Sequence, residues 1–332
     1  MQHDKILIAH GGGGVLTREL IETIIAPALG ADPSRLPDAA PVPGIDGLLF
    51  TTDSFVVKPL FFPGGDIGSL SVHGTVNDLA VSGAQPLALS LSLIIEEGLE
   101  ISVLREVIES AAAAARACGV GVITGDTKVV ARREADLLFV TTAGVGKRRI
   151  ATDPRSIREG DRVIVSGPIA QHGIAVMSRR EGIEFETEVQ SDSAPIWPLA
   201  SALIEHAIEI RVMRDPTRGG LAATLVELAD DGVVTVELDE KNIPIRPAVL
   251  GACEMLGLDP LTVANEGRLV AFVSEKDGRR AVEVLRGVAG GEEAGIIGTV
   301  MERGRSAVIM RTRFGGIRVV DMPYGEELPR IC

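Results

Sequence analysis

Short blocks of apolar residues, separated by glycine, proline and charged residues, run along the whole of this 332-residue chain. Apolar residues at helical spacing predict helices at about residues 17–28, 69–82, 102–118, 194–210, 217–229, 247–256 and 278–288. Continuous apolar runs predict strands at 48–52, 87–95, 120–124, 137–143, 162–166, 233–238, 269–274 and 295–302. Because strands and helices mix without strict alternation, the pattern favours an α+β fold over a doubly wound sheet.

A polar segment near residue 150 divides this pattern into two halves. Lys147-Arg148-Arg149 and Asp153-Pro154-Arg155 bring charges and a helix breaker together. We therefore expect one domain over 1–150 and a second over 151–322. Residues 323–332 contain two prolines and have neither the helical nor the strand period, so we expect them to form a mobile tail.

Composition narrows the class of protein. There are 33 Lys and Arg against 46 Asp and Glu, and a net charge of −13 disfavours binding to a nucleic-acid backbone. With 45% hydrophobic and 24% charged residues, the chain is expected to fold rather than to be disordered. No apolar run reaches the ~18–20 residues of a membrane span. Three cysteines are too few for a disulfide framework, so we expect a protein of the reducing cytoplasm.

Three aspartates stand among small or apolar residues rather than among charges. Asp53 follows the predicted strand 48–52, Asp78 lies in Val76-Asn77-Asp78-Leu79, and Asp126 lies in Gly125-Asp126-Thr127-Lys128 after the strand 120–124. Carboxylates that are buried together need a cation to neutralise them, and oxygen ligands suit Mg²⁺ beside a substrate phosphate. The alternative is three unrelated carboxylates in turns and helix caps.

Two glycine-rich segments have the composition of an anion-binding site. Gly11, Gly12, Gly13 and Gly14 precede a helix, where bare backbone N–H groups can lie against a phosphate. A flexible tether is the alternative for this run. Arg218, Gly219 and Gly220 open the predicted helix 217–229, with Thr217 as its expected cap. A tightly packed helix start is the alternative for this second segment.

Two single residues have the chemistry of a catalytic group. Glu266 stands before Gly267 at the edge of the predicted strand 269–274. A carboxylate there could be a general base, and the alternative is a simple turn carboxylate. Cys332 is the last residue, and a free thiol on a mobile end suits a carrier that moves a thioester-like group, unless it is accidental. Cys118 and Cys253 lie on predicted helices, where packing is the expected role.

Together these motifs resemble those of an ATP-dependent superfamily that includes aminoimidazole ribonucleotide (AIR) synthetase and selenophosphate synthetase. The motifs occur in the expected order: His10–Gly14, Thr51–Asp53, Val76–Leu79, Gly125–Lys128 and Asp215–Leu221. The ending Pro329-Arg330-Ile331-Cys332 is similar to that of one member, the HypE family of hydrogenase maturation factors. The resemblance implies two α/β domains of the AIR synthetase type, with the N-terminal domains of a homodimer paired into a β-barrel and ATP bound near that interface.

The resemblance also implies a reaction. In the HypE family a carbamoyltransferase, HypF, loads a carbamoyl group onto the terminal cysteine, which is Cys332 in this chain. ATP then phosphorylates the carbamoyl oxygen, and loss of phosphate leaves a thiocyanate. The cyano group passes to iron held by a HypC–HypD complex and becomes a cyanide ligand of a nickel–iron hydrogenase.

The same resemblance assigns roles to residues of this chain. Asp53, Asp78 and Asp126 would hold Mg²⁺ and ATP, residues 11–14 would close over the phosphates, and Arg218, Gly219 and Gly220 would line the cleft. Asn77 and Lys128 would assist with the phosphates or the carbamoyl group, and Glu266 would remove the amide proton. Two rival hypotheses stay open: a superfamily relative that activates a free purine precursor or selenide, and a thiol carrier without catalytic activity.

Overall fold

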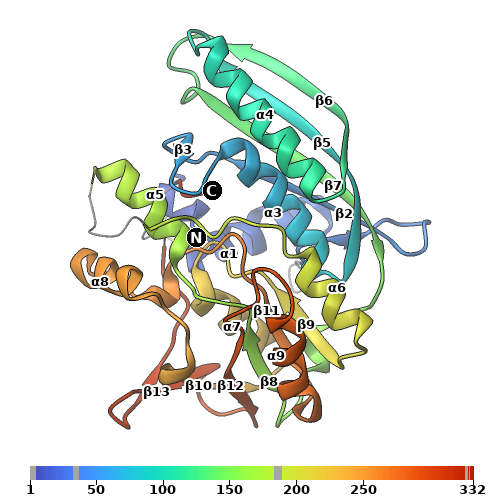
Figure 1. The fold of residues 1–332 in the computed structure, drawn as a ribbon, viewed down its shortest axis with the longest axis vertical. Helices are drawn as coiled ribbons and strands as arrows, with labels where there is room; N and C mark the ends of the chain where they lie inside the picture. The colour runs from blue at the N-terminus through green and yellow to red at the C-terminus, as the bar shows by residue number, and fades with distance from the viewer. Residues whose placement is uncertain (1–4, 33–36, 183–188, 326–327, 329) are drawn as a thin grey trace.

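Two β-sheets, each with helices packed on it, make up most of the molecule (Figure 1). The computed structural model describes residues 5–32, 37–182, 189–325, 328 and 330–332. Within these residues no helix combines the length and the apolar character that crossing a bilayer requires. The mixture of mostly antiparallel strands with helices confirms the α+β class.

The N-terminal half forms a five-stranded sheet with strand order β1-β2-β7-β5-β6. Its strands are β1 (Ala40–Pro41), β2 (Leu48–Phe55), β5 (Ala84–Glu96), β6 (Gly121–Val130) and β7 (Leu138–Arg148). Only the pair β5–β6 is parallel. Helices α3 (Ile67–Val81) and α4 (Ile101–Ala117) pack against this sheet and against each other. Buried and more exposed residues alternate along β7, as expected for a sheet with one covered face.

Helix α3 begins at a strong local signal. Asp66 caps it, because its carboxylate accepts hydrogen bonds from the backbone N–H groups of Gly68 (2.6 Å) and Ser69 (3.2 Å). The helix is apolar around most of its circumference, which fits its burial between α4, the five-stranded sheet and the C-terminal half. The short strands β3 (Phe61–Phe62) and β4 (Gly65–Asp66) form a hairpin just before it.

The C-terminal half forms a seven-stranded sheet with strand order β14-β13-β10-β12-β8-β11-β9. Its strands are β8 (Arg162–Val165), β9 (Ile210–Arg214), β10 (Thr235–Asp239), β11 (Val270–Val273), β12 (Gly295–Met301), β13 (Val308–Arg311) and β14 (Ile317–Val319). Its helices are α5 (Gln171–Glu181), α6 (Trp197–Glu205), α7 (Gly220–Asp231), α8 (Pro247–Leu256) and α9 (Gly278–Arg286). Short 3₁₀ segments lie before or between these elements: η3 (Pro154–Ser156), η4 (Glu240–Asn242), η5 (Pro260–Thr262) and η6 (Glu275–Asp277).

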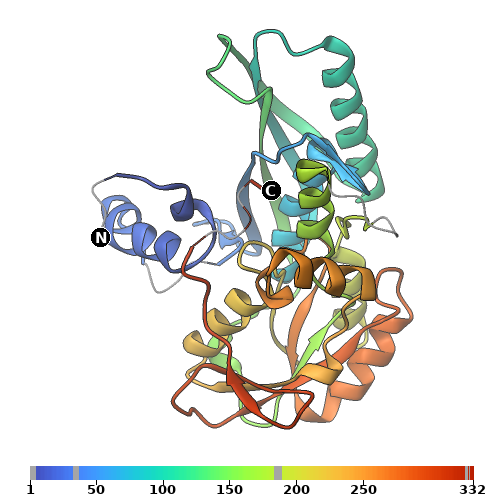
Figure 2. The same ribbon diagram turned by 90° about the vertical axis from the view of Figure 1, so that its left-hand side faces the viewer.

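The N-terminal and C-terminal segments of the chain contact each other beside these sheets (Figure 2). The N-terminal segment contains η1 (Ile8–Gly11), α1 (Val15–Leu20), η2 (Ile21–Ile25) and α2 (Ala26–Leu29), and it stands out from the rest of the molecule. The C-terminal segment leaves the lower sheet, passes this N-terminal segment and ends beside residue 56. Val15 and Leu16 donate backbone hydrogen bonds to the carbonyls of Pro323 (3.1 Å) and Tyr324 (3.4 Å).

Several predicted boundaries were wrong. β2 continues through Asp53 to Phe55, and β6 continues through Asp126 to Val130, because both strands keep their ladder pairing beyond the apolar run. The predicted helix 194–210 ends at Glu205, and β9 begins at Ile210. Thr217 does not cap the next helix, because the chain turns at Gly219 with φ +75° before α7 starts.

Candidate active site

A cluster of three carboxylates lies where the two halves meet. Oxygen atoms of Asp38, Asp78 and Asp215 all lie within 4.8 Å of one another. Asp78 comes from α3, whereas Asp215 directly follows β9. The hydroxyl of Thr51 donates to Asp78 Oδ2 (2.8 Å), and Arg214 forms an ion pair with Asp38. We call Asp38, Asp78 and Asp215 the acidic cluster.

Burial and mutual repulsion dominate the electrostatics of this cluster. Burial, followed by the charges of Asp215, Asp38 and Asp53, raises the pKa of Asp78 well above its usual range. Burial and the charge of Asp38 raise the pKa of Asp215 to about 7. Burial also raises the pKa of Asp53, although the charge of Arg218 opposes this. The protein alone therefore leaves negative charge in this region without full compensation.

These residues fit a divalent cation. The donors are carboxylate oxygens, which Mg²⁺ prefers, and a bound cation would relieve the repulsion that raises the pKa values. Two of the three donors, Asp38 and Asp215, had not been assigned to the metal from the sequence. Asp215 lay inside the quoted motif 215–221, and its position directly after an arginine was the available signal. Asp38 lies in a loop of aspartates and prolines that gave no such signal.

The structure does not bring Asp126 to Asp53 and Asp78 within one chain. Cross-strand pairing runs from Asp53 through Thr142 and Leu91 to Gly125, three strand spacings or about 14 Å. Asp126 is the residue after Gly125, so its side chain points to the opposite face of the sheet. It is exposed and forms an ion pair with Lys128 Nζ at 2.7 Å. That hydrogen bond lowers the pKa of Asp126.

Glu266 is a buried carboxyl with an unused oxygen. Only 2% of the residue is exposed, and among the described residues its Oε1 has no hydrogen-bond partner. Burial, followed by the charges of Asp215 and Asp53, raises its pKa well above the usual range. A carboxyl with a raised pKa and a free oxygen has the properties of a general base.

Asn77 lies beside Glu266, but its amide is already occupied. Its Nδ2 donates to the carbonyls of Ala194 (3.0 Å) and Glu266 (3.1 Å), and its Oδ1 accepts from the N–H of Ile196 (2.8 Å). Both donor hydrogens are therefore used, which leaves none for a phosphate or a carbamoyl group in this conformation. The contacts show that Asn77 joins α3 to the backbone of Glu266.

The two glycine segments pack against each other. Gly13 has φ +76°, and a Cβ there would lie 2.7 Å from Arg218 Cβ. A Cβ on Gly14 would lie 2.2 Å from the carbonyl oxygen of Pro323, and one on Gly220 would lie 2.5 Å from the carbonyl oxygen of Leu261. These positions need glycine because three backbone segments approach closely. Gly11 has no such neighbour, and a Cβ there would meet open space.

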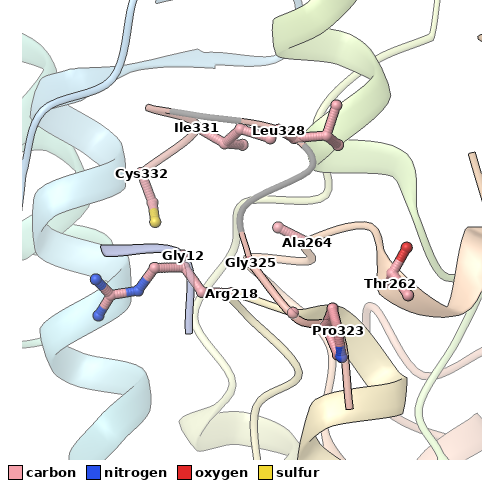
Figure 3. Close-up of a pocket in the computed structure, with 10 residues that line it drawn as sticks. Gly12, Arg218, Thr262, Ala264, Pro323, Gly325, Leu328, Ile331 and Cys332 are labelled. Atoms are coloured by element: carbon pink, nitrogen blue, oxygen red, sulfur yellow. The ribbon is translucent and has the colours of Figure 1, made fainter. Parts of the chain in front are cut away.

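The terminal cysteine lies at the centre of this arrangement. Figure 3 shows the Cys332 thiol directed toward Gly12 and Arg218. A cavity of about 30 Å³ adjoins it. Its lining residues come from the two terminal segments, from the turn before α7, and from η5 and the residues after it: Gly12, Arg218, Gly219, Thr262, Ala264, Pro323, Gly325, Leu328, Ile331 and Cys332. The charge of Cys332 is the main reason why the pKa of Arg218 is raised.

The other two cysteines have the surroundings of packing residues. Cys253 is fully buried in the main core, and Cys118 packs against a smaller apolar cluster. Burial raises the pKa of each thiol to about 11. Neither thiol forms a reactive thiolate near neutral pH under these conditions.

Comparison with known proteins identifies the family. Residues 37–147 match the N-terminal domain of AIR synthase related proteins, and residues 158–311 match the C-terminal domain. The carbamoyl dehydratase HypE of Cupriavidus necator is 48% identical over 99% of this chain and 95% of its own length. The chain belongs to the HypE family.

Solved structures agree with this assignment. The HypE chain of a HypE–HypF complex matches with a TM-score of 0.87 at 41% identity, over 92% of this chain and 99% of that one. A HypE structure in complex with ATP matches with a TM-score of 0.84 at 41% identity, over 99% and 100%. The resemblance inferred from the motifs and from the ending is therefore confirmed, as are two domains of the AIR synthetase type.

Proposed function

We propose that this chain is an ATP-dependent carbamoyl dehydratase, which converts a carbamoyl group on the Cys332 thiol into a thiocyanate for hydrogenase maturation. The observation that carries the proposal is the position of Cys332, whose thiol faces Arg218 between the two glycine segments. Membership of the HypE family supports the same reaction, because curated relatives named carbamoyl dehydratase align over nearly the whole chain.

The reaction needs one ATP for each carbamoyl group. The carbamoyl oxygen attacks the γ-phosphorus, the bond from that phosphorus to the bridging oxygen breaks, and ADP leaves while one N–H proton passes to a base. The C–O bond then breaks, phosphate leaves with the former carbamoyl oxygen, and loss of the second N–H proton gives the thiocyanate. Phosphorylation is needed because the oxygen of an amide is otherwise a poor leaving group.

The residues of the site suit these steps. Glu266 is the proposed base, because its free Oε1 is buried close to the charge of Arg218. Asn77 holds the backbone of Glu266 and is assigned a positioning role. Residues 11–14 and Arg218, Gly219 and Gly220 are proposed to enclose the phosphates. The acidic cluster, with Asp53 beside it, is proposed to hold Mg²⁺, which would neutralise phosphate charge during the transfer.

Asp126 and Lys128 are proposed to act in the second subunit of a homodimer. The outward face and the edge of the five-stranded sheet expose large apolar residues on three strands: Phe50, Leu87, Ile94, Val122, Ile123 and Val129. A paired N-terminal sheet would cover this surface and close the edge at β6. Asp126 and Lys128 project from that edge, so pairing would direct them toward the partner's site.

The remaining assignments follow from the family. A HypE chain forms a complex with HypF, and we propose HypF as the carbamoyl donor for Cys332. A HypC–HypD complex is the proposed acceptor of the cyano group. Three free cysteines fit a reducing cytoplasm. We also propose domains at 1–150 and 151–322 with a tail at 323–332, which agrees with family matches on either side of residue 150.

Intact-mass analysis tests the reaction. The protein is incubated with HypF, its carbamoyl source and Mg²⁺–ATP, and we expect a carbamoyl adduct on Cys332 that loses one water only when ATP is present. Cys332→Ala should abolish the adduct, whereas Cys253→Ala should leave it. An enzyme acting on a free small molecule would still form its product with Cys332→Ala. A carrier without catalytic activity would keep the adduct unchanged in ATP.

A further inference from the structure

The last three residues of the chain lie along a backbone segment of the N-terminal half. The N–H of Val56 donates to the carbonyl of Cys332 (3.3 Å), and the N–H of Lys58 donates to the carbonyl of Arg330 (3.2 Å). The two segments therefore run antiparallel, as neighbouring strands do. Backbone pairing of this kind binds an extended peptide without reading its side chains.

A buried histidine holds the carbonyl between these two. His172 Nε2 lies 2.9 Å from the carbonyl oxygen of Ile331, and His172 Nδ1 lies 2.8 Å from Ser191 Oγ. A carbonyl only accepts, so Nε2 carries the proton and Nδ1 accepts from the serine hydroxyl. The ring is fully buried and meets the Phe62 ring edge-on at 5.3 Å. Its orientation is thus fixed from two sides, and it points at the tail.

The side chain of Arg330 is bound separately. Its Nε donates to the carbonyl of Val56 (3.0 Å), its Nη1 forms an ion pair with Asp136, and its guanidinium lies over the Phe139 ring at 6.0 Å. Arg180 approaches from the opposite half and donates to the carbonyls of Lys58 (2.8 Å) and Arg330. These contacts select a planar, five-donor side chain, which lysine does not provide.

The backbone conformation of Arg330 also indicates that its surroundings hold the tail in place. Arg330 has φ +58°, in the left-handed region that costs a non-glycine residue about 1 kcal/mol or more. Such a conformation persists where surrounding contacts determine it. The turn directs Ile331 into the core, where it is 3% exposed, and brings Cys332 to Arg218.

We propose that Asp136, His172 and Arg180 form a binding site for the C-terminal peptide and are positioning residues for its thiol. This tail-binding site lies outside the acidic cluster and recognises an arginine two residues before the terminal cysteine. Its strength sets how often the tail is released. The consequence for the reaction rests on the proposed function: release favours carbamoyl loading by HypF, and docking favours dehydration.

Thiol alkylation tests the site on the full-length chain and needs no enzymatic activity. Cys332 and Cys253 are followed in one reaction by peptide mass spectrometry. We expect Asp136→Ala to accelerate alkylation of Cys332 about fivefold and His172→Phe to accelerate it about tenfold, because each removes a contact to the docked tail. Cys253 is fully buried, so its alkylation rate should stay unchanged and reports on any general unfolding. Asp230→Ala, which removes a similarly exposed partner of Arg303, is the matched control.

The enzymatic assay adds a second readout, because a merely structural role would not change dehydration and loading in opposite directions. In both variants we expect slower dehydration and unchanged or faster loading by HypF. The proposal is overturned if Cys332 alkylation keeps its wild-type rate in both variants, or if Cys332 and Cys253 accelerate equally. If Cys332 alone accelerates but the wild-type chain forms no thiocyanate, the tail-binding site stands and the proposed function fails.

Discussion

The acidic cluster and the pair Asp126–Lys128 present the same residue type in opposite settings. In the cluster, burial and neighbouring carboxylates raise the pKa values of Asp78 and Asp215. On the exposed strand β6, Lys128 already neutralises Asp126 and lowers its pKa. Arg214 forms an ion pair with Asp38, yet the pKa values of Asp78 and Asp215 stay raised, whereas Lys128 pairs directly with Asp126.

This difference shows what decides the use of a carboxylate. In the sequence, Asp53, Asp78 and Asp126 looked alike, because each stood among small or apolar residues. In the structure, Asp53 and Asp78 face the buried junction of the two halves, whereas Asp126 projects from the other face of the same sheet. We propose a cation at the first place and a partner surface at the second.

The largest effect is expected from Asp78→Asn. The change keeps the shape and the contact with Thr51, but it removes one charge from the proposed Mg²⁺ site. We expect dehydration in a single turnover to slow by about a hundredfold or more, since metal stabilisation of the transferred phosphoryl group is worth several kcal/mol. Thiocyanate formation by intact mass is the measurement.

Asp230→Asn is the control for this variant, because Asp230 is half-exposed, is paired with Arg303 and is not a member of the acidic cluster. It should react at the wild-type rate. Carbamoyl loading should be equal in all three proteins, because the tail contacts do not involve Asp78. Wild-type dehydration by Asp78→Asn would remove Asp78 from the proposed ligands.

A second experiment tests whether Lys128 acts across the dimer. Lys128→Ala and Glu266→Gln chains, each with its own tag, are combined and the mixed dimer is purified. One of its two sites then has an intact Glu266 and receives an intact Lys128 from the other chain. We expect about half of the wild-type activity, whereas each variant alone stays near background.

If both residues act within one chain, both sites of the mixed dimer are defective and no activity returns. Lys276→Ala serves as the control, because Lys276 is also exposed and paired with a carboxylate, Glu209. It should keep full activity on its own. The result decides between two roles for the pair Asp126–Lys128. It either acts in the partner's site, or it is a surface ion pair on an edge strand without a role in the reaction.

The sequence predicted the family, the α+β class and most helices and strands. Helix α8 was predicted at its observed bounds, because proline at its start and glycine after its end are strong signals. The motif series placed Asp53, Asp78, Asp126 and Arg218 in one site, the ending 329–332 added Cys332, and Glu266 was added as a candidate base from its short motif before Gly267. Whether each residue has its predicted role stays a prediction.

The sequence could not predict which face of a strand Asp53 and Asp126 occupy, because the predicted strands ended before these residues. Ending the strands before Asp53 and Asp126 made both look like loop residues, and their opposite orientation was lost. The sequence placed Asn77 at the substrate. It could not show that the Asn77 amide is already used in hydrogen bonds to Ala194, Ile196 and Glu266, because these residues are far from Asn77 in sequence. His172 gave no signal for the same reason, since its partner is the chain end.

The smallest effect concerns stability and compares Asp215→Asn with Asp126→Asn in metal-free buffer. The pKa of Asp215 is raised from its usual value near 4 to about 7 in the folded protein. A raised carboxyl pKa contributes stability that is fully present below pH 4 and is lost as the pH rises to about 7. We therefore expect Asp215→Asn to be more stable than wild type at pH 8, by about 2 kcal/mol, and the gain to vanish near pH 4. Asp126 is exposed and already paired, so Asp126→Asn should unfold like wild type at pH 8.

Urea unfolding at both pH values measures these differences in stability. Mg²⁺ at pH 8 should stabilise the wild type but not Asp215→Asn. Equal stability of wild type and Asp215→Asn at pH 8 would mean that the cluster carries no uncompensated charge, and the contrast between the two acidic regions would disappear.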